Sequence, residues 1–480
     1  MNSRPMLLRV LVAGVVCAVL AACSTLPPYS KPDVAVPAHY AATPGWSAAA
    51  PADQTPRGPW WTVFNDPELD RLEARVDVSN QTLKKAVSQL HQARALADYQ
   101  NAGFWPSVTA GVAQSRARTS QNVLGHSLAG KTVPDYSAGL SASWEPDLFG
   151  RIRDAATNAQ ANADASAADV EAVRLSVTSE LATDYFNLRS LDTQKKLLDD
   201  SVSAYAAALR LLNQQLANVA IDASAVAQAQ AQLESTRTQA TDTGAQRAQL
   251  QHAIAVLVGE PASTFTVAAH EQTLSVPDVP PGLPSQLLER RPDIAAAERR
   301  VFASNAQIGE ARAAYFPNLV LSASVGLEST FFAPWLSAPS LFWSLGPQLA
   351  ATIFDGGQRN ATLKSAHAQY DGSVADYRQT VLTSFQQVED DLTSLNALAD
   401  EAQSQRRASD AAALSLRLTT NRYQAGAVSY LDVVTAQTIA LTNERTAEQI
   451  DARRVIACVQ LLVALGGGWQ DTASPLASTK

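Results

Sequence analysis

Cysteine and methionine are scarce in this 480-residue chain, which contains three and two of them. Both methionines and Cys17 lie in an N-terminal segment that we expect to be removed, and Cys23 is assigned to a lipid anchor below. Cys458 then has no intrachain partner, which excludes a disulfide framework. It lies in an apolar helical run, where we expect a small buried hydrophobe. The two methionines also leave a dedicated copper-binding route unsupported.

Signals of catalysis are missing as well. The six histidines, at positions 39, 91, 126, 252, 270 and 367, are scattered without the spacing of a metal site. No phosphate-binding loop occurs. The charged residues Arg290, Arg291 and Asp293 are best explained by a helix that begins at Pro292. We therefore expect no enzymatic activity, no cofactor and no bound metal.

Charge is sparse and carries no basic cluster. Asp, Glu, Lys and Arg make up 17% of the chain, and the formal net charge is −8, whereas about 25% charged residues is typical of soluble domains. Phosphate binding needs clustered basic residues, so a nucleic-acid partner is disfavoured. Ala, Gln, Ser, Leu and Thr dominate instead, which suits helices with small packing faces.

One long apolar run is present, from Val10 to Ala22, and Arg4 and Arg9 precede it. This layout is typical of a secretory signal peptide, here residues 1–22, since a spanning helix needs about 20 apolar residues. The run ends in Leu-Ala-Ala-Cys23-Ser24, which resembles a bacterial lipobox. That resemblance implies lipidation of Cys23 and release to the outer membrane; the alternative is an ordinary signal peptide. Residues 23–61, rich in Pro, Ala and Ser, are expected to extend from the anchor.

The remainder of the chain repeats one pattern twice, over residues 62–262 and 285–466. A linker at 263–284 joins the copies, and a tail at 467–480 follows. Each copy begins with a helical pattern, which in the first runs from Pro67 to about Gly103 and is expected to be one helix. A strand pair and a very long helix follow, the latter a rod on the order of 100 Å at about 1.5 Å per residue. Tips near 218–222 and 425–430 turn each long helix into a return helix.

The strand pairs, at about 106–144 and 318–353, alternate apolar residues with small or polar ones. This alternation is the signature of outer-membrane barrels. Four strands cannot close a barrel, and open edges in lipid leave backbone groups unsatisfied, so several chains must share it, a trimer with twelve strands being the smallest. The alternative is the edge of a soluble sandwich. Aromatic residues flank the strands and would form a girdle: Trp105, Trp144, Phe316, Phe331, Phe332, Trp335 and Trp343.

Six motifs carry a family resemblance in order along almost the whole mature chain: residues 59–61, 144–153, 288–294, 353–357, 422–437 and 465–469. They resemble the outer-membrane lipoprotein components of tripartite efflux pumps, the NodT-like branch of the TolC family. The resemblance implies a mainly α protein with a membrane β-barrel. A homotrimer would share one 12-stranded barrel, four strands from each protomer, and continue into a long periplasmic α-helical barrel.

The same resemblance implies a place and partners. The protein would sit in the outer membrane, in contact with its lipid, and extend into the periplasm. Its partners would be a periplasmic adaptor protein and an inner-membrane transporter of the resistance-nodulation-division (RND) type. Its function would be that of an exit duct that passively conducts drugs or other small molecules and is gated at the periplasmic tip.

The tip motif Arg422–Gln437 supplies the candidate gate residues. By the resemblance, Leu431 matches an apolar gate position, Asp432 an acidic constriction position and Tyr423 a tyrosine that holds the closed state. Gly426 forms the tip turn. Thr435 stands where relatives often carry a second Asp, so the acidic ring is expected to be weaker here. The alternative is that Leu431 packs between helices and Asp432 is a solvated charge beside a turn.

Two functions of other classes stay open from the sequence. One is a lipid-anchored periplasmic coiled-coil scaffold or adaptor without a barrel, and the other is the exit duct of a type I secretion system. The alternating strands and their aromatic flanks favour the efflux duct, because a scaffold needs no lipid-facing strands.

Overall fold

A computed structural model describes residues 26–35, 59–122, 130–218, 222–271, 274–277 and 291–467. The predicted signal peptide, Cys23, residues 219–221 of the first tip and the tail beyond residue 467 lie outside the described residues. The chain forms two compact units. Unit 1 comprises Met1–Pro32, Gln89–Ser166 and Ala297–Tyr377, and unit 2 comprises Asp33–Ser88, Ala167–Ala296 and Arg378–Lys480.

The predicted tandem repeat is confirmed by elements of matching order and length. The first copy contains η1 (Trp60–Phe64), α2 (Pro67–Ser79), α3 (Gln81–Ala102), β1 (Ser107–Arg118), β2 (Thr132–Trp144), α4 (Arg151–Ala217) and α5 (Ala223–Leu257). The second contains α7 (Pro292–Ala313), β3 (Asn318–Ser329), η2 (Ala338–Ser340), β4 (Leu341–Ala350), α8 (Gln358–Gln424) and α9 (Tyr430–Ala464). Both long helices have 67 residues and both return helices have 35.

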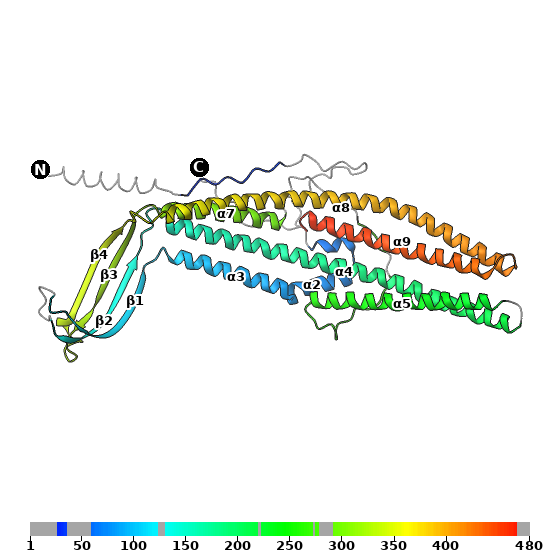
Figure 1. Cartoon of the computed structure of the whole chain (residues 1–480), viewed down its shortest axis with the longest axis horizontal. Coiled ribbons are helices and arrows are strands. Elements are labelled where there is room, and N and C mark those ends of the chain that lie inside the picture. Colours follow the sequence, from blue (N-terminus) through cyan, green and yellow to red (C-terminus); the bar gives the residue numbers. More distant parts are fainter. Residues whose placement is uncertain are drawn as a thin grey trace. The chain divides into compact units, whose positions relative to one another are not determined.

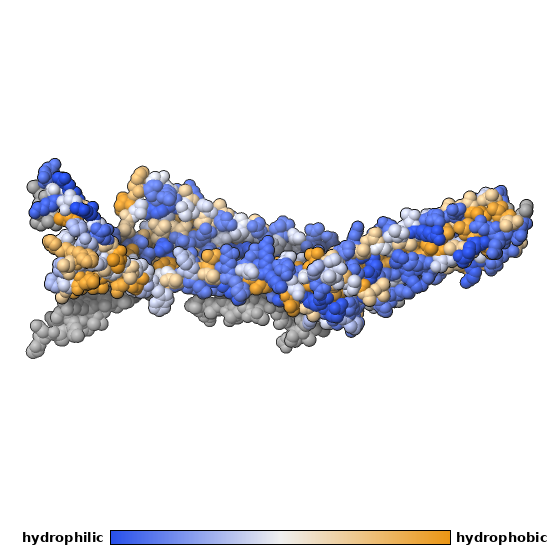
Figure 2. Space-filling view, turned by 90° about the horizontal axis from the view of Figure 1, so that it is seen from below, coloured by the Kyte–Doolittle hydropathy of each residue, from blue (hydrophilic) through white to orange (hydrophobic). Residues whose placement is uncertain are grey.

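The four strands of unit 1 form one antiparallel sheet in the order β1-β2-β3-β4 (Figure 1). Its register joins apolar residues across the strands in continuous rows, for example Val108, Ala142, Ala323 and Leu345. The opposite face carries rows of small polar residues, in which Ser324 and Ser344 share a hydrogen bond of 2.9 Å between their hydroxyls. Figure 2 shows the apolar surface over the strands. The predicted alternation therefore gives a sheet with one apolar and one polar face.

The strands differ in length from the sequence expectation. β1 and β2 pair from Ser107↔Ser143 to Arg118↔Thr132, so they extend well into the polar stretch from Ser115 to Asp135, which the sequence predicts as the loop between them. β4 ends at Ala350, three residues short of the predicted end, and the side chain of Ile353 is 91% exposed. The alternating apolar pattern ends before the hydrogen-bonded ladder does in β1 and β2, because backbone pairing continues where the side chains have become polar.

The helix predicted from Pro67 to about Gly103 is instead two helices, α2 and α3, interrupted at Asn80. Asn80 has an extended backbone, and its side-chain oxygen accepts a hydrogen bond from Leu83 N at 2.8 Å, as a helix cap does. Its side-chain amide donates to the carbonyl of Leu257, also at 2.8 Å. The break is thus stabilised by a contact with a residue 177 positions away, which the local apolar period does not reveal.

In unit 2, α2 packs against α4 through a buried polar and apolar contact. Asp66 caps α2 by accepting from Glu68 N and Leu69 N, and its second carboxylate oxygen accepts from the Tyr185 hydroxyl at 2.7 Å. Leu69 and Leu72 are fully buried beside it. The Pro67 helix start expected from the sequence is therefore present, and a cap of this kind contributes about 1 kcal/mol.

Residues 26–32 lie along α7 in unit 1 as a non-helical segment. The Tyr29 hydroxyl donates to Glu298 at 3.2 Å, and its ring packs edge-on against Phe302. The Asn305 side chain donates to the carbonyl of Pro27 at 3.0 Å. These contacts hold the first described residues of the chain against a helix that leads directly into β3.

Candidate functional site: the tip of the second helical hairpin

The turn between α8 and α9 is built by a glycine cap. Gly426 has φ +72, a left-handed conformation that favours glycine. Its N–H donates to the carbonyl of Tyr423, and the N–H of Ala427 donates to that of Arg422, both at 2.9 Å. This is the Schellman arrangement, which satisfies the last carbonyls of a helix. Residues Gly426–Ser429 therefore form a defined turn at the end of α8.

The start of α9 is capped by Ser429 and Asp432. The Asp432 carboxylate accepts hydrogen bonds from Ser429 N–H at 2.9 Å and from the Ser429 hydroxyl at 2.7 Å, both through Oδ2. These bonds from the Ser429 side chain and backbone lower the pKa of Asp432 below its ordinary 3.8. Asp432 is exposed and stays ionised at neutral pH, so it supplies a fixed negative charge at the tip.

Tyr423, the third predicted gate residue, is half-buried against Tyr430. The ring centroids are 5.4 Å apart and the planes are inclined by 66°, an edge-to-face pair. Burial raises the pKa of both phenols, so both stay protonated at neutral pH. Tyr430 is 7% exposed and joins a small apolar core with Val433, Leu212 and Ala229. The two hairpins are thus packed together at their tips.

Tyr430 is the tip residue that sequence reasoning missed. It directly follows the Ser429 cap and fills the contact with Leu212 of the first hairpin. An aromatic residue next to a cap, three positions before the apolar Val433, was the available signal. The roles of Tyr423 and Tyr430 are coupled, because the two rings pack against each other edge to face.

Leu431 points away from this core. Its side chain is 53% exposed, although its neighbours Tyr430 and Val433 are buried. Thr435 and Ile439 follow at four-residue intervals on the same helix face; Thr435 is exposed and Ile439 is 50% exposed. The structure therefore does not support packing of Leu431 within one chain. It places an apolar side chain beside the Asp432 charge on the free face of α9, and Figure 2 shows apolar surface at this end of unit 2.

The tip of the first hairpin is also capped by an acid. Asp222 is the N-cap of α5, and its side chain accepts from Ser224 N at 3.0 Å. The preceding residues 219–221 lie outside the described residues. Asp222 and Asp432 thus both stand at the start of a return helix, although only the second tip carries a leucine directly before its acid.

Hydrogen bonds hold the two return helices together behind the tips. Thr438 donates to the Gln232 side chain at 3.3 Å, and Arg445 donates to the Gln239 side chain at 2.7 Å. In each pair the partners are 206 positions apart. The Tyr430 core and these hydrogen bonds make α5 and α9 one packed layer. One tip therefore cannot move independently of the other without breaking these contacts.

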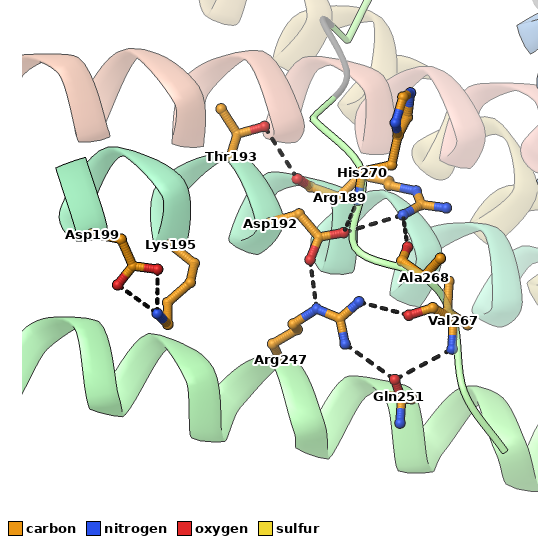
Figure 3. A network of polar contacts seen from close by, with 10 residues as sticks. All are labelled: Arg189, Asp192, Thr193, Lys195, Asp199, Arg247, Gln251, Val267, Ala268 and His270. Atoms are coloured by element: carbon orange, nitrogen blue, oxygen red, sulfur yellow. Dashed lines mark hydrogen bonds and ion pairs between the residues drawn. The ribbon is translucent and has the colours of Figure 1, made fainter.

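A second polar network, in the middle of unit 2, fixes the segment after α5 to the helices (Figure 3). Buried Asp192 of α4 accepts from Arg189 at 3.1 Å, from Arg247 of α5 at 2.5 Å and from the His270 backbone N–H at 3.2 Å. The two guanidinium groups also donate to backbone carbonyls of this segment, those of Ala268 and Val267. One carboxylate therefore joins two helices and a loop, and the sequence gives no periodic signal of it.

Features of an active site are not found in the described parts of the chain. No group of three potential metal-ligating side chains lies together there. Cys458 is 1% exposed, and burial raises the pKa of its thiol to about 12, so it is protonated and packs as a hydrophobe, as predicted. None of the described helices has the length and apolarity that crossing a membrane requires.

Comparison with known proteins agrees with this architecture. The sequence matches the family described as "Outer membrane efflux protein" over residues 74–260 and 283–467. The pyoverdine export outer membrane protein OpmQ of Pseudomonas aeruginosa is 33% identical over 467 residues, which is 96% of this chain and 97% of OpmQ. The cation efflux system protein CusC of Escherichia coli O6:H1 is 30% identical over 452 residues, 94% of this chain and 97% of CusC.

A solved structure shows the same fold. The open state of the MtrE outer membrane channel of Neisseria gonorrhoeae aligns with a TM-score of 0.82 at 27% identity, covering 93% of this chain and 99% of MtrE. The chain belongs to the outer membrane efflux protein family, and the two matched regions correspond to the two structural repeats. It is an outer-membrane exit channel of an efflux system, extends into the periplasm and is not an enzyme.

Proposed function

We propose that three copies of this chain form one duct, each giving four strands to a twelve-stranded barrel. The sheet of unit 1 carries the proposal. One face is apolar in row after row, the other is lined by Ser, Gly and Thr, and β1 and β4 are the outermost strands. An open edge is costly in lipid, and pairing β1 of one copy with β4 of the next satisfies it.

The proposed duct has a lipid anchor and two protein partners. Cys23 carries the lipid, and the periplasmic helices contact an adaptor protein that joins the duct to an inner-membrane RND-type transporter. The relatives are described as a cation efflux protein and a pyoverdine export protein. Such different cargoes support a passive lumen of small polar side chains, in which the transporter rather than the duct selects the drug or other small molecule.

The proposed gate is the free face of α9 at the second tip. Leu431 is exposed beside ionised Asp432, on a tip whose opposite side is packed by Tyr430 and Tyr423. Three such faces brought together on an axis place an apolar ring next to an acidic ring. An apolar constriction closes by losing water, and a ring of acids in a narrow pore attracts cations. The first-hairpin tip contributes packing through Leu212.

Single-channel conductance of the purified protein in planar bilayers tests the gate. Asp432→Ala is expected to raise the conductance, and Leu431→Ser to raise it more, because a hydroxyl keeps the constriction hydrated. Leu382→Ser is the matched control: Leu382 of α8 is 54% exposed, against 53% for Leu431, and lies outside the tip. Unchanged conductance in both tip variants, or an equal rise in the control, would refute the gate assignment.

Oligomer size and heat modifiability after detergent extraction of outer membranes test the shared barrel. A trimer that resists detergent until it is boiled is expected. Release of a monomer by salt, or by removal of the lipid alone, would show that the chain is a lipid-anchored periplasmic scaffold instead.

A further inference from the structure

The four strands contain four charged residues, and these are divided by sign between the two faces of the sheet. Arg116 and Arg118 lie on the β1 positions that continue the row pattern of Val108 and Val112, so they belong to the apolar face. Asp135 of β2 and Glu328 of β3 pair with Ser115 and Ser137, residues of the polar face. This separation by sign indicates that the two faces of the sheet contact different environments.

Chain connectivity identifies the end of the sheet that carries these charges. β1 and β3 begin directly after α3 and α7, while β2 and β4 end shortly before α4 and α8. All four helix-connected strand ends therefore lie together, and the hairpin loops lie at the opposite end. Because the helices are periplasmic, the loop end, with Arg116 and Arg118, faces the outside of the cell.

Distance along β1 places the two arginines at the level of lipid headgroups. The apolar rows run from Leu319↔Leu349 to Leu327↔Leu341, a separation of eight positions along β3, which is about 27 Å along a strand at ~3.4 Å per residue. With a tilt of about 40° this spans roughly 20 Å of membrane, close to the apolar band of outer-membrane barrels. Arg116 lies four positions beyond Val112 of the last apolar row, about 14 Å further along the strand.

Among the described residues, neither guanidinium has a partner of its own. Both side chains are exposed, and in the described ranges neither forms an ion pair or a side-chain hydrogen bond. The residues opposite them in the β1–β2 ladder are Pro134 and Thr132, which offer no negative charge. The next row toward the apolar band contains Tyr136, whose ring packs with Phe332 and Trp335. An aromatic and cationic rim of this kind fits a headgroup region rather than open water.

We propose that Arg116 and Arg118 form a binding site for the phosphate groups of an outer-leaflet lipid, an inference that rests on the proposed barrel. Two guanidinium groups two residues apart on one strand, about 7 Å, present parallel donors to an anionic headgroup while the acyl chains contact the apolar rows. Asp135 and Glu328, on the polar face of the sheet, line the water-filled mouth of the proposed barrel. The site binds lipid on the outer wall and takes no part in conduction.

Lipid retention by the purified full-length trimer tests the site. The protein is reconstituted in phosphatidylcholine vesicles that contain bisphosphorylated lipid A, re-extracted in mild detergent and analysed for bound lipid by native mass spectrometry. The double variant Arg116→Gln/Arg118→Gln is expected to retain lipid A about 30-fold more weakly, which is about 2 kcal/mol, since each basic residue at an anionic surface contributes about 1 kcal/mol. Arg116→Lys/Arg118→Lys is expected to keep most of the binding.

The control removes the same charge elsewhere. Lys84→Gln/Lys85→Gln alters two exposed cations of α3 and is expected to retain lipid A like the wild type. Lipid A without phosphates is expected to be lost as readily from the wild type as from the Gln variant, and excess inorganic phosphate is expected not to displace the intact lipid. Equal retention by the Gln variant, indifference to the lipid phosphates, or displacement by free phosphate would each overturn the proposal.

Trimer formation distinguishes failure of this lipid site from failure of the proposed barrel on which the site rests. Each variant is first examined for the heat-modifiable trimer. Wild-type protein without such a trimer would overturn the barrel and the site together, whereas intact trimers whose lipid retention does not depend on Arg116 and Arg118 would overturn the site alone.

Discussion

The Asp432 carboxylate accepts both the backbone N–H and the hydroxyl of Ser429, so one side chain caps α9 and carries the negative charge of the tip. The cap and the proposed gate therefore share a single ionisable group. Any condition that protonates Asp432 removes the charge and weakens the cap at once.

Tip opening is accordingly expected to depend on acid. The Ser429 bonds hold the pKa of Asp432 below 3.8, so the charged cap is fully present above pH 3.8 and is lost as the pH falls through the lower folded-state value. Single-channel recordings should show a constant closed state from neutral pH to about pH 4 and openings below it. Ser429→Ala removes the hydroxyl donor but keeps the backbone N–H donor, and should move the onset of opening toward higher pH. An onset that Ser429→Ala leaves in place would separate the cap from the gate.

Asp192→Ala is expected to destabilise unit 2 strongly. The substitution leaves Arg189, whose side chain is 4% exposed, and Arg247 without their carboxylate, and breaking a buried pair in this way costs about 3–5 kcal/mol. Hydrogen exchange measured by mass spectrometry should rise over residues 265–271, which the network attaches to α4 and α5. Asp199→Ala is the control, because its bond to Lys195 is exposed (Figure 3) and such pairs contribute about 0–1 kcal/mol. Similar effects of the two variants would show that the network adds nothing beyond a surface pair.

Glu73→Gln is expected to flatten the pH dependence of stability. Glu73 is fully buried, and neither carboxylate oxygen has a hydrogen-bond partner within the described residues. Burial, followed by the charges of Asp77 and Asp70, raises the pKa of Glu73 from 4.5 to about 10. The wild type is thus most stable relative to the variant below pH 4.5 and loses this contribution as the pH rises toward 10.

Thermal unfolding of the detergent-solubilised trimer at fixed protein concentration measures this effect. Between pH 5.5 and 8 the wild type should lose on the order of 3 kcal/mol per chain that the Gln variant retains. Glu68→Gln on the same helix is the opposite control, because the Arg71 bond lowers the pKa of Glu68. A wild-type slope that Glu73→Gln does not change would place the ionised carboxylate in contact with water.

Gly326→Ala is expected to weaken the sheet. A Cβ on Gly326 would lie 2.5 Å from the carbonyl oxygen of Ala138 and 2.8 Å from the Phe342 ring, so the β2–β3 ladder would have to separate. Gly346 of β4 has open space around the same position and supplies the matched variant, Gly346→Ala. The temperature at which the trimer dissociates on gels should fall for Gly326→Ala and stay within a few degrees of the wild type for Gly346→Ala. Equal dissociation temperatures would show that the strands yield without cost.

Most features that follow from the local periodicity of apolar residues were predicted from the sequence. Alternation in Tyr136–Trp144 predicted the apolar face, and the Gly426 break predicted the tip. What it missed depends on contacts between distant residues. The break at Asn80 depends on the Leu257 carbonyl, and the Asp192 network joins charges 55 positions apart in the chain. Neither leaves a periodic trace, whereas the lipidation of Cys23 and the gate roles of Leu431 and Asp432 stay predictions.

The equal lengths of the paired helices have a consequence for chain length itself. Because Thr438 donates to Gln232 and Arg445 donates to Gln239, the return helices α5 and α9 are held in one register at these positions. Inserting or deleting a turn in one hairpin alone would misalign these partners and separate Tyr430 from Leu212. The length of each hairpin therefore constrains the length of the other. The helices can become longer or shorter only when both copies change by the same number of residues.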